Sequence, residues 1–274
     1  MKKPVFVLLS LFLGSSISAF EPVTALDDGF AVPSQTGMVE AVLSYPGAES
    51  FAEGVFALGA WSVPYGIEDL AVTTCHAGMN CGKAGFSISY SGSGFELYGD
   101  EVEKLGVSYA LFRNASAGVR ITRSAMHISG FGNAAAWSCD AGVILRPFDS
   151  VYIAGVVEDI TQAELGESSE PLDGRSRFMA SWSTTGGVTF ISTITKVRRF
   201  NPSISAGLTV RALDVLTLGI LGANEPDRFE FLCEVTAKGM RFSYRGSYHR
   251  DLDLSHGFSL SWAPGYKSVS GVRE

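Results

Sequence analysis

The sequence predicts an all-β protein, an antiparallel up-and-down transmembrane β-barrel of about 12 to 14 strands. Three observations predict it: apolar and polar residues alternate through most of the chain, an export signal stands at its start, and charged residues are scarce. Alternating strands of about ten residues, separated by turns, are the sequence signature of a barrel with a lipid-facing exterior and a wet interior. The alternation is clearest in residues 240–249, where Met240, Phe242, Tyr244 and Tyr248 share one parity and Arg241, Ser243, Arg245, Ser247 and His249 the other.

The first nineteen residues have the pattern of a signal peptide. Lys2 and Lys3 precede an apolar run from Val5 to Leu13, and small residues follow up to Ala19. Charged, apolar and small residues in this order are typical of a cleaved export signal. A transmembrane helix would need about twenty apolar residues, which is more than this run contains. We therefore expect an exported protein that resides in the bacterial outer membrane.

Composition favours a membrane barrel and argues against a nucleic-acid partner. Only 18% of the 274 residues are charged, and 31 are glycine. Soluble domains carry about 25% charged residues, whereas lipid-facing positions tolerate charge poorly. The net charge is -7, and the sequence contains no concentrated basic patch of the kind that binds phosphates.

The chain divides into four predicted parts. Residues 1–19 are the signal peptide, 20–54 a lead-in or plug segment without sustained alternation, 55–263 the barrel, and 264–274 a tail. A closed single-chain bacterial barrel usually has an even number of strands, so twelve or fourteen are expected. Thirteen candidate strands can be marked: 55–63, 84–91, 104–112, 115–123, 134–145, 151–157, 177–182, 188–197, 203–213, 215–221, 228–236, 240–249 and 257–262.

The connections between candidate strands differ in length. Arg113-Asn114, Asp214 and Lys238-Gly239 are short enough for hairpins, whereas residues 158–176 form a long acidic connection. Short turns at one end and longer loops at the other are usual for the periplasmic and external ends of outer-membrane barrels.

Charged side chains of both signs occupy the parity expected to face the lumen. One interpretation is a structural network of cross-strand Arg and Glu pairs, because unpaired charges in a narrow barrel are costly. The alternative is that the same side chains line a solute path and set its selectivity. The candidates are Arg120, Arg211, Glu230, Glu234, Arg241 and Arg245.

Cys75 and Cys81 flank His76 in a segment that reads as a loop. In an oxidising compartment such a pair can form a disulfide or remain as two free thiols. Metal ligation by Cys75, His76 and Cys81 is the less favoured interpretation, since no further ligand cluster lies nearby. Cys139 and Cys233 occupy strand positions where a small apolar residue would serve. No motif for a catalytic triad or a metal centre occurs, so neither an enzymatic activity nor a cofactor is expected.

Several short segments carry a family resemblance. They are residues 104–112 (KLGVSYALF), 116–122 (SAGVRIT), 128–133 (ISGFGN), 139–147 (CDAGVILRP) and 151–158, with Gly130-Phe131-Gly132 and Asp140-Ala141-Gly142 among them. These segments resemble the PorV/PorQ-like outer-membrane proteins, distant relatives of FadL-type barrels. The resemblance implies a non-enzymatic barrel surrounded by outer-membrane lipid. Its role would be passage or binding of a small or hydrophobic solute, or a scaffold that contacts components of a secretion machine.

The rival interpretation is an exported soluble β-sandwich, such as an adhesin-like binding module. A sandwich would bury its apolar parity between two sheets, whereas a barrel would present that parity as an outer band. The closure of the sheet therefore distinguishes the two.

Overall fold

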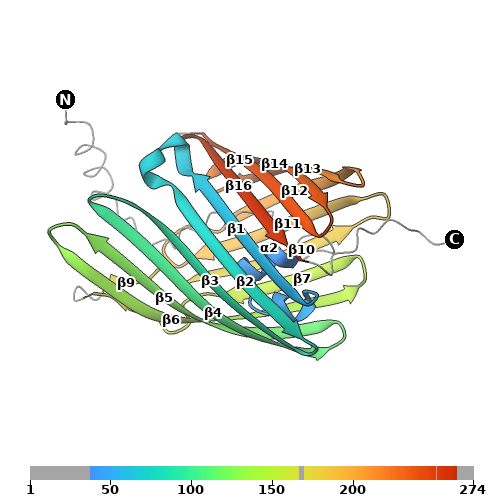
Figure 1. Cartoon of the computed structure of the whole chain (residues 1–274), viewed down its shortest axis with the longest axis horizontal. Coiled ribbons are helices and arrows are strands. Elements are labelled where there is room, and N and C mark those ends of the chain that lie inside the picture. Colours follow the sequence, from blue (N-terminus) through green and yellow to red (C-terminus); the bar gives the residue numbers. More distant parts are fainter. Residues whose placement is uncertain (1–37, 167–169, 251, 264–274) are drawn as a thin grey trace.

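The computed structural model of the chain describes residues 38–166, 170–250 and 252–263. Within them, fourteen strands form one closed antiparallel barrel (Figure 1). The strands follow one another around the ring, and β1 closes it by pairing with β16. They are β1 (Val55–Val63), β2 (Val72–Cys81), β3 (Ala84–Phe95), β4 (Tyr98–Phe112), β5 (Ala115–Ile128), β6 (Gly132–Phe148), β7 (Val151–Val157), β10 (Arg175–Ser183), β11 (Val188–Val197), β12 (Ser203–Leu213), β13 (Leu216–Asn224), β14 (Asp227–Ala237), β15 (Met240–His249) and β16 (Asp253–Trp262).

The wall has the expected two faces. In β16, Phe258, Leu260 and Trp262 are about half exposed on the outside, while Ser259 and Ser261 are buried on the inside. The same alternation holds in β15, where Phe242 faces outward and Ser243 inward. The barrel prediction is thus confirmed. The β-sandwich alternative is wrong, because the apolar parity lies on the outside of one closed sheet.

The sequence interpretation missed one strand, β2. Its inward positions include Thr74 and His76, and its outward positions include Thr73, Cys75 and Ala77. The two faces differ little in polarity, so the alternation is weak, and the segment reads as a loop. Its register with β1 and β3 places it in the wall and completes an even number of strands.

The two ends of the barrel have different connections. Val55 at the start of β1 and Trp262 at the end of β16 lie at one end, together with the turns at residues 82–83, 113–114 and 238–239. The opposite end carries η2 (Pro64–Gly66), η3 (Glu68–Leu70) and the long connection from β7 to β10, which contains β8 (Glu164–Leu165) and β9 (Glu170–Pro171). Outer-membrane barrels usually have short turns at the periplasmic end and longer loops at the external end. We therefore call the first end periplasmic and the second end external.

Two short helices precede the barrel, α2 (Met38–Ser44) and η1 (Ala48–Phe51). Figure 1 shows α2 enclosed by the ring of strands. In the described part of the chain, no helix is both long and apolar enough to cross a membrane. The predicted signal peptide (1–19), the first part of the predicted lead-in and the predicted tail (264–274) lie outside the described residues.

Candidate functional site

The candidate site is the lumen and the segment that fills it, residues 38–51, called the plug from here on. The plug buries apolar side chains, including Val39, Val42 and Tyr45, against inward-facing residues from around the ring. Because the members of this cluster come from both sides of the barrel, the plug lies within it. The wall residues of the cluster are Phe56, Leu58 and Ala60 of β1, Val72 of β2, Ile144 of β6, Tyr152, Ala154 and Val156 of β7, Met179 of β10, Ile191 of β11, Leu221 of β13 and Leu232 of β14.

Glycines on the inner wall give the plug room. A Cβ atom added to Gly118 would lie 2.5 Å from the backbone nitrogen of Gly47, and one added to Gly142 would lie 2.5 Å from the carbonyl oxygen of Pro46. A Cβ at Gly85 would lie 2.5 Å from the Cβ of Glu49. Contacts this short are not sterically possible, so any side chain at these positions would push the plug away from the wall. The wall residues are thus matched to this segment.

An ion pair fixes the start of the plug to β15. Glu40 accepts a hydrogen bond from Arg241 at 2.7 Å and another from the Ser261 hydroxyl at 2.9 Å. Arg241 also lies 3.2 Å from Glu234 on β14. Glu40 and Arg241 are both buried, and removing one partner of such a pair leaves an uncompensated charge at a cost of about 3–5 kcal/mol. Either substitution should therefore loosen the plug.

A second arginine fixes the end of α2. Arg120 on β5 donates hydrogen bonds to the carbonyl oxygens of Leu43 and Val42, at 2.7 and 2.8 Å. The last carbonyls of a helix have no partner within the helix and carry partial negative charge, so a cation stabilises them. Arg120 is buried, and its described hydrogen bonds go to these backbone carbonyls.

Polar groups hold η1 against β2, β3 and β4. Glu49 accepts hydrogen bonds from the Gly47 backbone at 2.9 Å and from the Ser87 hydroxyl at 2.8 Å. The hydroxyls of Ser50 and Ser108 are 2.7 Å apart. Asn80 donates to the carbonyl oxygens of Ser50 and Ala52. These contacts lie near the periplasmic turns, so the plug occupies the periplasmic half of the lumen.

The structure places the six predicted lumen residues on inward positions, in different surroundings. Arg120, Arg241 and Glu234 meet at the plug as described. Glu230 is buried and lies 2.6 Å from Arg228 on the same strand. Arg245 is buried in β15. Arg211 is half-buried near the periplasmic end of β12, and no described hydrogen bond joins its side chain to the plug. Glu40 was not a candidate, because the charge pattern of the strands gives no sign of a partner outside the wall.

Of the two alternatives left open for Cys75 and Cys81, the structure is compatible with free thiols and not with a disulfide. Cys75 and Cys81 are free thiols on the same strand, six residues apart. At about 3.3 Å per residue their Cα atoms are about 20 Å apart, and a disulfide requires about 7 Å or less. Metal ligation by the three candidates is equally unsupported, since both cysteines face outward and His76 inward. The described residues contain no group of three or more His, Cys, Asp or Glu that could hold a metal ion.

Between the plug and the external end, a row of polar side chains crosses the inner wall. His76, Ser89, Lys104, Thr122 and Ser138 are paired in register on β2 to β6, and all are buried. His76 stacks on Phe56 with ring centroids 5.6 Å apart. This part of the lumen therefore offers hydroxyl, imidazole and ammonium groups next to the apolar side chain of Phe56.

The described parts of the connection between β7 and β10, residues 158–166 and 170–174, are called the lid from here on and pack against the inner wall at the external end. Its Leu165 and Leu172 pack against Val102 and Ala136 on the inner wall. Asp140 on β6 anchors it by accepting a hydrogen bond from the Asp159 backbone at 3.0 Å. Burial raises the pKa of the Asp159 carboxyl above its usual value, and hydrogen bonds from Ala163 and Thr161 partly offset this.

No family model and no curated protein match this sequence. Solved structures do match. The toluene transporter TodX of Pseudomonas putida has a TM-score of 0.62 at 11% identity over 88% of this chain and 96% of its own. The fold of this chain is thus similar to that of FadL-type outer-membrane β-barrels. The toluene transporter TbuX of Ralstonia pickettii scores 0.57 at 8% identity, covering 82% of this chain and 93% of its own.

A FadL homologue of Pseudomonas aeruginosa has a TM-score of 0.55 at 10% identity, over 82% of this chain and 94% of its own. At these identities the likeness concerns the FadL-type fold alone. Membership of the narrower PorV/PorQ-like group is not shown by these matches and stays a prediction.

Proposed function

We propose that this FadL-type barrel is a channel for small hydrophobic solutes, closed by its own plug in the state described. The observation that carries the proposal is the apolar part of the inner wall, which lies in one cluster with the plug. Phe56, Leu58, Ile144 and Met179 face the lumen and are almost completely buried against the plug and one another. A porin that conducts water and ions has a polar lumen, whereas an apolar wall favours solutes that leave water readily.

The external mouth supports the same proposal. Leu165 and Leu172 of the lid form an apolar cluster with Val102 and Ala136, and Met126 packs against it. This cluster offers a hydrophobic solute a first place to leave water before it reaches the apolar wall deeper in the lumen. The plug must then shift for passage to the periplasm, because its contacts fill the periplasmic half.

Two of the similar structures are named as toluene transporters, which makes small aromatic hydrocarbons the first solutes to test. The scaffold role that the PorV/PorQ-like resemblance implies remains a prediction, and no described contact favours it over a channel.

The test measures solute uptake by a variant in which a disulfide can fix the plug to the barrel wall. Ser50 and Ser108 have hydroxyl oxygens 2.7 Å apart, so the double variant Ser50→Cys/Ser108→Cys should form a disulfide between η1 and β4. The four native cysteines would be replaced by serine to prevent mispairing. Uptake of labelled toluene by cells producing the parent protein should exceed uptake by cells without it.

In the locked variant uptake should fall to the background of cells without the protein, and reductant should restore it. The single variant Ser108→Cys is the matched control and should behave as the parent. Uptake by the oxidised double variant at the parent rate would show that the plug does not close the path. No toluene uptake above background in the parent would contradict the hydrophobic-solute proposal itself.

A further inference from the structure

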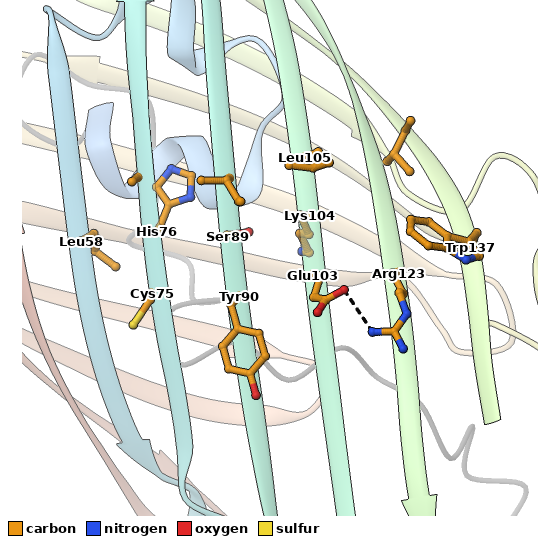
Figure 2. Close-up of a pocket in the computed structure, with 13 residues that line it drawn as sticks. Leu58, Cys75, His76, Ser89, Tyr90, Glu103, Lys104, Leu105, Arg123 and Trp137 are labelled. Atoms are coloured by element: carbon orange, nitrogen blue, oxygen red, sulfur yellow. Dashed lines mark hydrogen bonds and ion pairs between the residues drawn. The ribbon is translucent and has the colours of Figure 1, made fainter. Parts of the chain in front are cut away.

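The outer wall carries a groove of about 420 Å³ across β1 to β6. Figure 2 shows its lining, with Cys75 and Tyr90 directed away from the lumen and His76 on the side of the plug helices. Residues with inward side chains, namely Leu58, His76, Ser89 and Lys104, contribute the strands that form its floor. The outward side chains that line it are Cys75, Ala77, Ile88, Tyr90, Glu103, Leu105, Ile121, Arg123 and Trp137.

Strand register divides these outward side chains into two rows. Cys75, Tyr90, Glu103, Arg123 and Trp137 pair in sequence across β2 to β6 and form a polar and aromatic row. The next row toward the periplasmic end is apolar and consists of Ala77, Ile88, Leu105 and Ile121. The row beyond it, Met79, Phe86, Val107 and Val119, is also apolar and exposed. The two apolar rows, called the apolar track from here on, thus extend from the polar and aromatic row toward the periplasmic end.

The polar row contains charges of both signs on the lipid-facing side. Arg123 and Glu103 lie 3.1 Å apart, with side chains one third and one half exposed. The Tyr90 hydroxyl donates a hydrogen bond to Glu101, the next outward residue on β4. Charges on the outer face of a membrane barrel are costly unless they lie near the headgroups, where aromatic residues also gather. Tyr90 and Trp137 therefore place this row at headgroup level.

We propose that the groove binds one phospholipid whose headgroup carries both a phosphate and a primary ammonium. The phosphate accepts hydrogen bonds from Arg123, and the ammonium donates to Glu103 and Glu101. An acyl chain follows the apolar track over Ile88 and Leu105.

Charge complementarity selects this occupant. A purely anionic headgroup, such as that of phosphatidylglycerol or lipopolysaccharide, would place its phosphates beside two carboxylates that face a single guanidinium. A choline headgroup has the right charges, but its quaternary nitrogen has no N–H to donate to Glu103. Phosphatidylethanolamine satisfies both signs and both hydrogen-bonding roles.

The test uses the barrel in nanodiscs that contain equal amounts of phosphatidylethanolamine, phosphatidylcholine and phosphatidylglycerol, with lipopolysaccharide added in a parallel set. Native mass spectrometry then identifies the lipid retained after release. We expect one phosphatidylethanolamine per barrel, retained about tenfold over phosphatidylcholine, a ratio that corresponds to about 1.4 kcal/mol. Preferential retention of phosphatidylcholine, phosphatidylglycerol or lipopolysaccharide, or no retained lipid, would overturn the proposal.

Two variants locate the site. Ala77→Phe fills the apolar row and should abolish retention, whereas Ala206→Phe, the same change on the exposed outer face of β12, should leave it unchanged. Glu103→Gln leaves Arg123 without its acidic partner and should shift the preference toward phosphatidylglycerol. A heat-modifiability gel checks that each variant is folded. Retention that Ala77→Phe does not reduce, or a preference that Glu103→Gln does not change, would place any bound lipid elsewhere.

Discussion

Inward-facing glycines determine how closely the plug approaches the wall. We expect Gly118→Ala to displace the plug, because the added Cβ would lie 2.5 Å from the Gly47 nitrogen. Overpacking of this kind costs about 1–3 kcal/mol. Protease cleavage within residues 38–52 should accelerate, while the barrel stays heat-modifiable. Gly222→Ala is the control, since nothing lies within 4 Å of its Cβ position. Equal cleavage rates for the two variants would contradict the close fit.

If the outward side chains face lipid, the cost of an outward arginine in folding stability should depend on its depth in the bilayer. Ile220 lies outward in the middle of β13, between Leu208 and Phe231. Ile220→Arg should cost about 2–4 kcal/mol in folding stability, as arginine does at the bilayer midplane. Leu213→Arg, at the exposed end of β12, should cost about 0–1 kcal/mol. Refolding into lipid vesicles over a urea series measures both, and equal losses would argue against the assigned position of the membrane.

The cysteines give a chemical check on strand β2. All four are free in the described structure, and Cys75 and Cys81 are too far apart on one strand to be bridged. We expect four thiols per chain to react with a maleimide in protein that is denatured without reductant. Two unreactive thiols that appear only after reduction would mean that β2 does not have this register.

At the level of elements, the sequence was informative where the two faces differ and uninformative where they do not. β15 alternates phenylalanine and tyrosine with arginine and serine, and its face assignment was confirmed. β2 places threonine, cysteine and alanine outside, and it was missed. The same weak contrast kept a Cys75–Cys81 disulfide open as an alternative, because a loop can bring two cysteines together and a strand cannot.

The plug contacts could not be derived from the strand pattern. Arg120 lies on the inward parity, which predicted a glutamate partner across the sheet, but its partners are the carbonyl oxygens at the end of α2. Backbone acceptors leave no signal in a charge pattern. Glu40 could not be paired with Arg241 either, because about 200 residues separate them and only closure of the barrel brings them together.

The lid should be held mainly by its anchor on β6. Asp140 accepts hydrogen bonds from the Asp159 backbone and from the Thr122 hydroxyl, both at 3.0 Å. Asp140→Ala removes both, and a lost hydrogen bond to a charged group costs about 1.5–3 kcal/mol. Amide hydrogen exchange in residues 159–165 should become faster. Asp149→Ala, in an exposed turn at the periplasmic end, should have no effect there. Unchanged exchange in Asp140→Ala would assign the anchoring to Leu165 and Leu172.

For the whole molecule, plug and lid together predict how the barrel conducts. The plug fills the periplasmic half through the Glu40–Arg241 pair and the Arg120 contacts, and the lid packs on the inner wall at the external end. A path obstructed at both ends should pass few ions even though fourteen strands enclose it. In planar bilayers the unmodified protein should therefore show little steady conductance.

The double variant Arg120→Ala/Arg241→Ala should open the path through the lumen. Without Arg241 the buried Glu40 and Glu234 lose a shared partner, and without Arg120 the end of α2 loses its cap, so the plug should leave the lumen. Steady conductance should rise, and stability should fall by about 3 kcal/mol or more. Arg211→Ala, an arginine of the same inner wall without a described plug contact, should change neither. An ion-selective conductance in the unmodified protein, shifted in selectivity by Arg211→Ala or by the double variant without loss of stability, would instead mean that these arginines line an open path.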